Sequence, residues 1–477
     1  MITDAVLSKK KLGQFFTENA NSAIVNLPDL TELNVPELTR LTPATYITLA
    51  IANSKLAKIN LPFLEQSPTI LLGENLQELN LTNLRYLIFS GDNALGGDYD
   101  SINLICNTKI EKLVLPNFYG MNNITTVNNL RILKNNYWLK VFDIGNEFIE
   151  EPLNAYYFGW SWLTNSYFLT DIFLRHPYTL PINGSGSDPL SLASSTPFSI
   201  NSPFHSQAYI FVPNSCLQSY KDANFWGDSA TYNNFVAIED YNDTIKNRFA
   251  DTLTKSWEEI SNDATRYETT GAEKSTILSD GYREGLTKTV YIDGCPTQMI
   301  LVGINQDYLK NSTTRAAFTW MESSIARFNL INTYSGEKNY NDANYLKTEL
   351  ERIYNTIDIK PYIKEVTKLT KCGATSQQSN DFIWIPAPFE INNSWNVPTY
   401  AGIYASSSTY QYFMDQNHRP IYYFGRSGLQ PDNANLVALR EWENEYNNPY
   451  CIKNNGTEFS PAETNNRNHY IIVGFCM

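Results

Sequence analysis

Polar aromatic side chains and one arginine in the last third of the chain are the residues best suited to hold a ligand. Aromatic rings stack on sugar rings or fill protein pockets, and a guanidinium group binds a carboxylate through parallel hydrogen bonds. The aromatic side chains and the arginine in the segments 391–418 and 426–469 are therefore candidate ligand contacts; the alternative is that about half of these rings pack the interior. The candidates are Trp395, Tyr400, Tyr404, Tyr410, Tyr412, His418, Arg426, Trp442 and Tyr446.

No pattern typical of an enzyme accompanies these residues. Catalysis of this kind needs a paired acid and base, or a nucleophile beside a base. The sequence contains no GxSxG, HExxH, P-loop or dinucleotide fingerprint. The pair Glu258–Glu259 is interpreted as the solvated face of a helix, and no strand–helix frame or lysine follows the loop 184–188. We expect a non-enzymatic protein without a cofactor.

The residues that usually bind metals show no ligand spacing. Histidines in such an arrangement are structural or surface residues more often than ligands. Asp92, Asp98 and Asp100 offer oxygen ligands for calcium, but they lack the EF-hand order, which favours a plain acidic turn. No metal site is predicted. The four histidines are His176, His205, His418 and His469.

The cysteines are widely spread and form no CxxC pair. In a long chain this distribution is typical of reduced, buried, structural thiols. Disulfides are the alternative if the mature protein lies outside a cell. The six cysteines are Cys106, Cys216, Cys295, Cys372, Cys451 and Cys476.

The elements that position these residues begin with a repeated Leu-x-x-Leu-x-Leu pattern. The last two leucines alternate along a strand and face one side, and the first closes the turn above the same core. One unit cannot bury that face alone, so neighbouring units must stack. This predicts an irregular leucine-rich-repeat solenoid over 24–240, with a leucine-rich globular domain as the alternative. The copies are 30–35, 56–61, 76–81, 110–115, 139–144 and 169–174.

The segment Tyr209–Pro213, followed by Tyr220 and Trp226, resembles the last repeat of the irregular BspA-like leucine-rich repeats of bacterial surface proteins and some phage proteins. The resemblance implies that Tyr209–Val212 forms the final strand. It also implies that Tyr220 and Trp226 cover the end of the core. The Ser/Gly/Pro-rich segment 179–203 is interpreted as a surface loop.

Two further segments flank the repeats. Residues 1–23 are polar and are interpreted as a tether to a larger assembly or as a poorly ordered terminus. Residues 241–285 are predicted to form a helical linker whose N-cap lies in Asn242–Thr244. Its apolar stripe either docks on a neighbouring domain or pairs with copies of itself. The stripe consists of Ile245, Phe249, Leu253, Trp257 and Ile260.

The C-terminal part, 286–477, combines short β-like runs with one helical stretch, Tyr345–Thr356. This mixture predicts a compact α+β domain with an antiparallel sheet, so the whole chain is an α+β multidomain protein. The expected strands are Thr287–Ile292, Met299–Ile304, Phe382–Ile385, Pro420–Phe424 and Tyr470–Phe475.

The same region resembles a small domain of unknown function that occurs in phage and bacterial surface proteins. The resemblance implies a lectin-like fold of the C-type class, in which a stable frame carries a variable polar surface. It also implies that the binding face comes from the segments 391–418 and 426–469. This chain has Phe-Gly-Arg-Ser where the family has Trp-Leu-Arg-Ser, and it lacks the closing Arg-Pro. The matching segments are Ile300–Ile304, Ile363–Lys368, Phe424–Ser427 and Val473–Met477.

The composition of the chain limits the classes of partner that it is expected to bind. The net charge of −13 argues against nucleic acid, which needs clustered Lys and Arg. No apolar run reaches the length of a membrane span, and the N-terminus has no secretion signal, so we expect no membrane insertion. The 31 tyrosines and 9 tryptophans suit a binding surface, although AT-rich coding would produce the same bias.

Together these features predict a structural virion protein of a tailed bacteriophage, a head fibre, tail fibre or receptor-binding component. Its expected partners are a bacterial surface glycan or protein receptor and, through residues 1–23, other virion proteins. A homotrimer would add avidity. Such a protein is made in the host cytoplasm and released by lysis. The alternatives are a bacterial surface adhesin, a purely structural decoration protein, and a glycan-active enzyme on a fibre.

Overall fold

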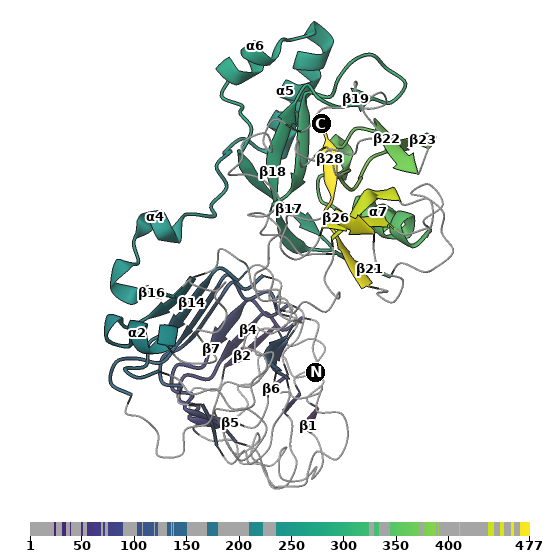
Figure 1. The fold of residues 1–477 in the computed structure, drawn as a ribbon. Coiled ribbons are helices and arrows are strands. Elements are labelled where there is room, and N and C mark those ends of the chain that lie inside the picture. Colours follow the sequence, from purple (N-terminus) through teal and green to yellow (C-terminus); the bar gives the residue numbers. More distant parts are fainter. Residues whose placement is uncertain are drawn as a thin grey trace. The chain divides into compact units, whose positions relative to one another are not determined.

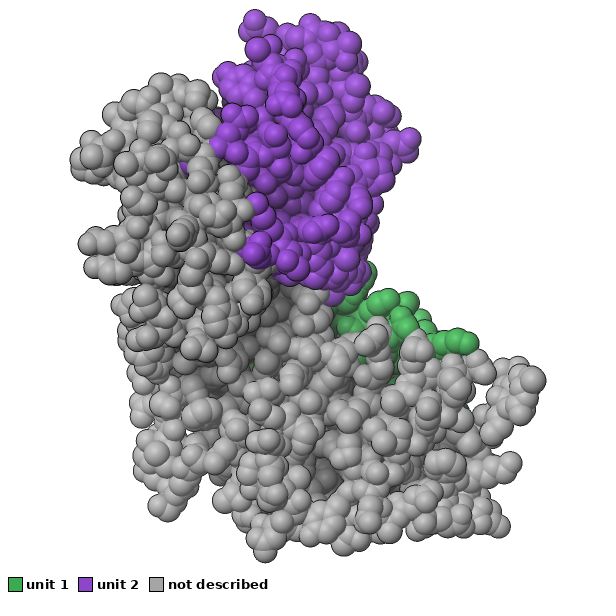
Figure 2. All heavy atoms as spheres, turned by 90° about the vertical axis from the view of Figure 1, so that its right-hand side faces the viewer, with its two compact units in different colours: residues 1–246 green, residues 247–477 purple. Residues whose placement is uncertain are grey.

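The computed structural model divides the chain into two compact units, Met1–Lys246 and Asn247–Met477 (Figure 2). The described part is of mixed α and β structure, with several sheets and few helices (Figure 1). No helix in that part is long and apolar enough to cross a membrane. The structure describes residues 23–24, 31–34, 39, 49–50, 55–67, 70–71, 75–88, 103–106, 108–118, 120–122, 131–134, 136, 138–149, 169–179, 209–222, 235–323, 329–332, 344–372, 375–387, 390, 410, 437–442, 449–452, 459–461 and 468–477.

Unit 1 consists of short parallel strands stacked side by side. In one copy of the pattern Leu56, Ile59 and Leu61 are all buried. Ile59 and Leu61 are alternate residues and therefore face the same side. Four sheets result. They are β1–β3–β6 (Ala23–Ile24, Leu49–Ala50, Ile70–Leu71), β2–β4–β7 (Glu32–Asn34, Lys58–Asn60, Glu78–Asn80), β5–β8–β11 (Gln66–Ser67, Tyr86–Ile88, Gly120–Asn122) and β9–β12 (Asn103–Cys106, Arg131–Lys134).

A fifth, larger sheet continues the stack. Its strands pair in parallel, so that Leu113, Phe142 and Ile172 occupy equivalent interior places. Every copy of the repeated pattern contains a strand, which confirms the strand prediction. The strands of this sheet are β10 (Lys112–Leu115), β13 (Val141–Ile144), β14 (Asp171–Leu174), β15 (Tyr209–Val212) and β16 (Phe235–Ala237).

The end of this sheet differs from the expectation. Tyr209–Val212 is a strand as implied, but it is not the last, because β16 pairs in parallel with it. Helix α2 (Asn214–Asp222) follows β15, and its Tyr220 is fully buried with its ring stacked on Phe235, 5.4 Å between centroids. The Phe235–Ala237 strand is too short for a periodic signal. Trp226 lies outside the described residues.

Asparagines link neighbouring strands of unit 1. Asn34, Asn60 and Asn80 occupy one register position on β2, β4 and β7. Asn60 Nδ2 donates to Asn34 Oδ1 at 2.9 Å, and Asn80 Nδ2 donates to Asn60 Oδ1 at 2.7 Å. These side-chain bonds run along the stack, parallel to the backbone ladder, and hold the strands in register.

Unit 2 is centred on an antiparallel sheet of four strands in the order β17–β18–β20–β28. Asp293 and Gly294 both have positive φ, 51° and 70°, and form the two-residue turn between the first two strands. Such turns match the twist of antiparallel neighbours. The strands are β17 (Thr287–Ile292), which is confirmed as predicted, β18 (Cys295–Ile304), which contains the predicted Met299–Ile304, β20 (Phe318–Glu322) and β28 (Gly474–Cys476).

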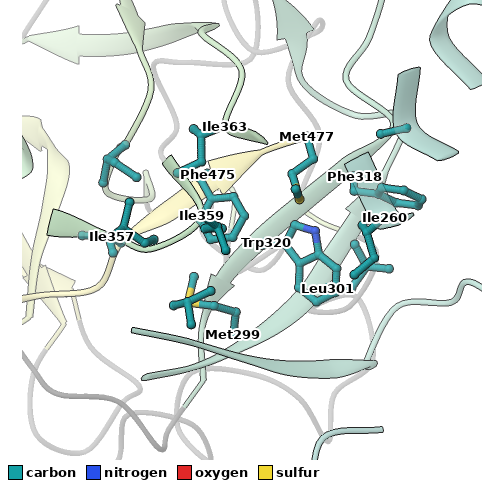
Figure 3. Packing of buried hydrophobic residues seen from close by; sticks show 14 of the residues in the cluster. Ile260, Met299, Leu301, Phe318, Trp320, Ile357, Ile359, Ile363, Phe475 and Met477 are labelled. Atoms are coloured by element: carbon teal, nitrogen blue, oxygen red, sulfur yellow. The ribbon is translucent and has the colours of Figure 1, made fainter. Parts of the chain in front are cut away.

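One face of this sheet carries the core of unit 2. Figure 3 shows Trp320 beside Leu301 and Ile260, and all three are fully buried. Phe475 belongs to the same cluster and lies 5.9 Å, between ring centroids, from Trp257. The first and last segments of unit 2 therefore pack together through apolar contact, the main force that stabilises a folded domain.

The predicted linker helix is interrupted. The N-cap lies within Asn242–Thr244 as predicted: it is Asn242, whose Oδ1 accepts the Ile245 N–H at 3.1 Å. The helix it begins, α4 (Asp243–Lys246), ends after one turn, so a single continuous helix is wrong. The backbone N–H groups of Thr252 and Leu253 bond instead to Thr287 O, at 3.1 and 3.2 Å. The 3-10 turn η2 (Ile238–Asp240) precedes α4.

The second half of the segment 241–285 belongs to unit 2. Helix α5 (Trp257–Thr270) begins at Ser256, which forms a capping box with Glu259, and ends at Gly271 in the left-handed conformation. Helix α6 (Lys274–Ser279) follows. Leu253 and Ile260 lie in the core, so this part of the stripe docks within the chain.

A second sheet of unit 2 is mixed rather than purely antiparallel, because β22–β24 and β24–β27 pair in parallel. Helix α7 (Asn344–Thr356) confirms the predicted helix 345–356, and the 3-10 turn η4 (Lys360–Tyr362) follows it. The strands are β19 (Tyr308–Leu309), β21 (Asn329–Asn332), β22 (Val366–Cys372), β23 (Thr375–Asp381), β24 (Val437–Trp442), β25 (Pro449–Ile452), β26 (Phe459–Pro461) and β27 (Asn468–Ile471).

Two of the strands expected in unit 2 differ from the prediction. Phe382–Ile385 is not a strand: only Trp384 forms an isolated bridge, exchanging both backbone hydrogen bonds with Gly474. Tyr470–Phe475 is divided between β27 and β28. In the sequence, a short apolar run that pairs as a strand cannot be distinguished from one that only passes through the core. Pro420–Phe424 lies outside the described residues.

Candidate functional site

One face of helix α7 forms the first wall of a surface cleft. Lys347, Glu351 and Tyr354 follow one another at the three- and four-residue spacing that puts side chains on the same side of a helix. Leu350 lies on the same wall, and it is buried against the core of unit 2. The helix is therefore anchored by its apolar residues and presents its polar ones to the cleft.

Strand β23 forms the opposite wall. It pairs antiparallel with β22, with Thr367 opposite Asn380 and Val366 opposite Asp381. Its sequence, Thr-Ser-Gln-Gln-Ser-Asn-Asp, is entirely polar. In unit 2 of Figure 1 the β22–β23 hairpin and α7 are both labelled. The hairpin supplies amide, hydroxyl and carboxylate groups, and the helix supplies amide, charged and aromatic ones.

The cleft between these walls has a volume of about 760 Å³. That size falls in the range typical of ligand pockets. Its lining residues are Lys347, Leu350, Glu351, Tyr354, Asn355, Gln378, Ser379, Asn380, Asp381, Phe382 and Ile383.

An aromatic pair forms the apolar part of the lining. Tyr354 and Phe382 stack with 4.5 Å between ring centroids and 17° between planes. Both are half-buried, and the ammonium of Lys360 lies 4.6 Å from the Tyr354 centroid. A cation at this distance is attracted to the ring. The exposed parts of the two rings offer a hydrophobic surface next to hydrogen-bonding groups.

The amide groups of the cleft are held in place. Lys360 Nζ donates to Asn355 Oδ1 at 2.7 Å, and Thr367 Oγ1 donates to Asn380 Oδ1 at 3.0 Å. With both oxygens fixed, the amide NH₂ groups are oriented as donors. Ser379 Oγ donates to Asp381 Oδ2 at 2.5 Å, which fixes an acceptor nearby. The lining thus combines preorganised donors, acceptors and an aromatic surface, the groups that recognise polyhydroxylated ligands.

Histidines, cysteines and acidic residues were the other candidates for chemistry in the sequence. The described residues contain no group of three or more His, Cys, Asp or Glu that could hold a metal ion. His176 is buried, and burial lowers its pKa to about 4, consistent with a structural residue. Cys216, Cys295 and Cys476 are buried free thiols, which confirms the cysteine prediction for these three. The region containing Asp92, Asp98 and Asp100 lies outside the described residues, as does His205.

Of the nine predicted ligand contacts, the structure describes two. Tyr410 is 1% exposed, and its hydroxyl lies in a buried network with Lys368 and Asp307, so it packs the interior of unit 2. Trp442 ends strand β24, opposite Pro449. The rest lie outside the described residues: Trp395, Tyr400, Tyr404, Tyr412, His418, Arg426 and Tyr446.

The cleft itself was not predicted from the sequence. Tyr354 falls inside the predicted helix, but its partner Phe382 was assigned to a strand. An all-polar segment such as 375–381 resembles a loop, because it lacks the apolar alternation of a half-buried strand. The usable signal was the polar run 375–381 directly before Phe382.

No protein-family model, no curated protein and no solved structure matches this chain.

Proposed function

We propose that this chain is a recognition protein that binds a glycan in the cleft between α7 and β23. The observation that carries the proposal is the aromatic pair Tyr354–Phe382 beside fixed amides and a carboxylate. Sugar C–H faces pack on aromatic rings, and sugar hydroxyls pair with amide and carboxylate groups. A polar rim around a small apolar surface suits a ligand that is itself mostly polar.

The architecture supports a structural attachment protein. We interpret unit 1 as an irregular leucine-rich-repeat solenoid, since its parallel strands recur with the Leu-x-x-Leu-x-Leu pattern. We interpret unit 2 as a lectin-like domain of the C-type class. In this proposal the protein belongs to the head or tail fibre of a tailed bacteriophage, residues 1–23 join it to other virion proteins, and trimerisation multiplies weak sugar contacts.

Binding by the full-length chain to intact bacterial cells and to purified capsular polysaccharide tests the proposal. Gln378 and Asn380 are exposed and line the cleft, so a Gln378→Ala, Asn380→Ala double variant should weaken saturable binding about tenfold, the effect of losing two hydrogen bonds. Thr254→Ala, an exposed residue of unit 2 that does not line the cleft, is the matched control.

Three other results would redirect the proposal. Unchanged binding by the cleft variant, together with loss on Trp395→Ala or Arg426→Ala, would move recognition to the segments 391–418 and 426–469. Absence of binding by a folded, oligomeric chain would favour the structural decoration role. Cleavage of the polysaccharide would establish the enzyme alternative, and a secreted precursor at the bacterial surface would establish the adhesin alternative.

A further inference from the structure

A charged network lies in the interior of unit 2, formed by residues that do not line the cleft. Tyr308 pairs with Thr367 across the antiparallel strands β19 and β22, and this register sets the preceding Asp307 opposite Lys368. Lys368 is 2% exposed and Asp307 is 9% exposed. The Lys368 Nζ atom contacts Asp307 Oδ1 directly. An amine and a carboxyl group are thus held together in a nearly water-free place.

A second carboxylate lies next to the same amine. Glu390 is 3% exposed, and its Oε1 is 3.3 Å from Lys368 Nζ. Its other oxygen, Oε2, accepts the Ala387 backbone N–H at 2.8 Å, so the carboxylate is fixed in position. The amine therefore has one carboxyl group in contact and another within proton-transfer distance.

Aromatic rings enclose the amine. The Lys368 Nζ atom is 3.6 Å from the Trp384 ring centroid, and it donates to Tyr410 Oη at 2.6 Å. Both rings are buried and lie 5.9 Å apart between centroids. A side chain substituted at Gly474 would collide with Trp384, so the backbone there also closes the site.

The far oxygen of Asp307 is surrounded by donors. Thr319 Oγ1 donates to Asp307 Oδ2 at 2.7 Å, Tyr410 Oη donates to it at 3.2 Å, and Cys476 Sγ lies at 3.5 Å. Burial raises the pKa of the Cys476 thiol well above its usual range, so this group keeps its proton and remains a donor. Donors in this arrangement stabilise negative charge that develops on a carbonyl oxygen.

As an ion cluster, this network is costly. One ammonium and two carboxylates are removed from water, so their charges do not balance, and buried ion pairs seldom recover the cost of desolvation. An amide, by contrast, is uncharged. Covalent condensation of the amine with one carboxyl group would remove two of the three charges and leave one carboxylate.

We propose that Lys368 and Asp307 join spontaneously in an intramolecular isopeptide bond, with Glu390 as the proton relay. No external reactant is required, because the amine, the carboxyl group and the relay all belong to this chain. The bond would link the residue before β19 to β22 and cross-link unit 2 internally.

The step balances as a condensation. A proton passes from the ammonium to the Asp307 carboxylate, which gives a neutral amine and a neutral acid. The nitrogen lone pair then attacks Asp307 Cγ, and Oδ2 takes the negative charge among its donors. Glu390 accepts a proton from the nitrogen and delivers it to the Oδ1 hydroxyl, which leaves as water. One C–N bond forms, one C–O bond breaks, and nothing is oxidised or reduced.

Denaturing mass spectrometry of the intact full-length protein tests the bond. The wild-type chain is expected to weigh less than its sequence by the mass of one water molecule. Digestion should yield a branched peptide that joins the segment containing Asp307 to the segment containing Lys368. Lys368→Met removes the nucleophile at similar size, and this variant should have the full sequence mass.

Glu390→Gln tests the proton relay independently of the reacting pair. This variant keeps both the amine and the Asp307 carboxyl group, and it should also remain at the full sequence mass. A wild-type chain at full mass would overturn the proposal. So would a water loss that persists in Lys368→Met, or a branched peptide that joins Lys368 to Glu390. Complete cross-linking in Glu390→Gln would remove Glu390 from the mechanism.

Discussion

At the scale of single residues, Glu322 is a carboxyl group in an unfavourable place. It is 1% exposed at the end of β20, and its Oε2 accepts the Val473 N–H at 2.9 Å. Burial raises its pKa from 4.5 to about 8. Because desolvation penalises the charged form, the group stays protonated in the folded protein at neutral pH.

This raised pKa predicts a stability that depends on pH. Between about pH 4.5 and 8 the folded state keeps the Glu322 proton and the unfolded chain does not, so stability decreases by a few kcal/mol as pH rises through this window. Glu322→Gln, which cannot ionise, should remove this slope. Chemical denaturation at pH 5 and 8.5 measures it. Parallel profiles for the two proteins would show that Glu322 ionises normally.

Gly145 illustrates a steric requirement at the same scale. It has φ +78°, and a side-chain carbon there would lie 2.5 Å from Cε1 of His176. The His176 ring is buried, with Nε2 2.8 Å from Phe118 O. The His176 ring fills the space that a side chain at position 145 would need, so the ring can occupy this position only if residue 145 is glycine.

Gly145→Ala is therefore expected to lower the free energy of unfolding by about 2–5 kcal/mol, from the left-handed backbone and the collision together. Gly271→Ala is the matched control, since Gly271 has φ +64° but no atom within 4 Å of the added carbon. It should cost only the backbone part, about 1–2 kcal/mol. Equal losses in urea denaturation would mean that the His176 contact is unimportant.

At the scale of elements, a second set of asparagines connects neighbouring segments of unit 1. Asn117 Nδ2 donates to Thr82 O at 2.9 Å and lies 3.3 Å from Asn83 Oδ1. Asn146 Nδ2 in turn donates to Pro116 O at 2.7 Å and lies 3.2 Å from Asn117 Oδ1. These bonds satisfy backbone carbonyls that the strands leave unpaired.

Asn117→Ala interrupts this set in the middle and should cost about 1–3 kcal/mol, because it removes hydrogen bonds and leaves a carbonyl without its donor. Phe148→Ala is the control: its side chain is 83% exposed, so the change should be nearly neutral. Urea denaturation followed by circular dichroism measures both. If Asn117→Ala lowers the free energy of unfolding no more than Phe148→Ala does, water replaces the asparagine side chain without cost.

At this scale, prediction from the sequence succeeded where the apolar residues of an element recur with a regular period. The repeats of unit 1 and helix α7 were predicted because their buried residues recur at fixed spacing. It failed at the stripe from Ile245 to Ile260. Helical spacing is present there, but residues 252 and 253 gain backbone bonds to Thr287, which a local pattern cannot reveal.

At the scale of the whole molecule, the proposed cross-link would stabilise unit 2. It closes a loop between residues separated by 61 positions, which restricts the unfolded chain and contributes about 4 kcal/mol. Glu390→Gln keeps the charged pair but should lack the bond. Its free energy of unfolding is therefore expected to fall by at least this amount in guanidinium denaturation. A fall of only about 1 kcal/mol, the value of one hydrogen bond, would show that no cross-link contributes.

The sequence by itself determined which segments form the repeated strands, where α7 runs, and that the chain is acidic and rich in aromatic residues. These properties depend on local spacing and composition. Only the tertiary structure placed Asp307, Lys368 and Glu390 together, and only it set the polar strand β23 against α7. The reason is physical: the partners lie far apart in the chain, and the sheet register and the apolar core that bring them together form only when the whole domain folds.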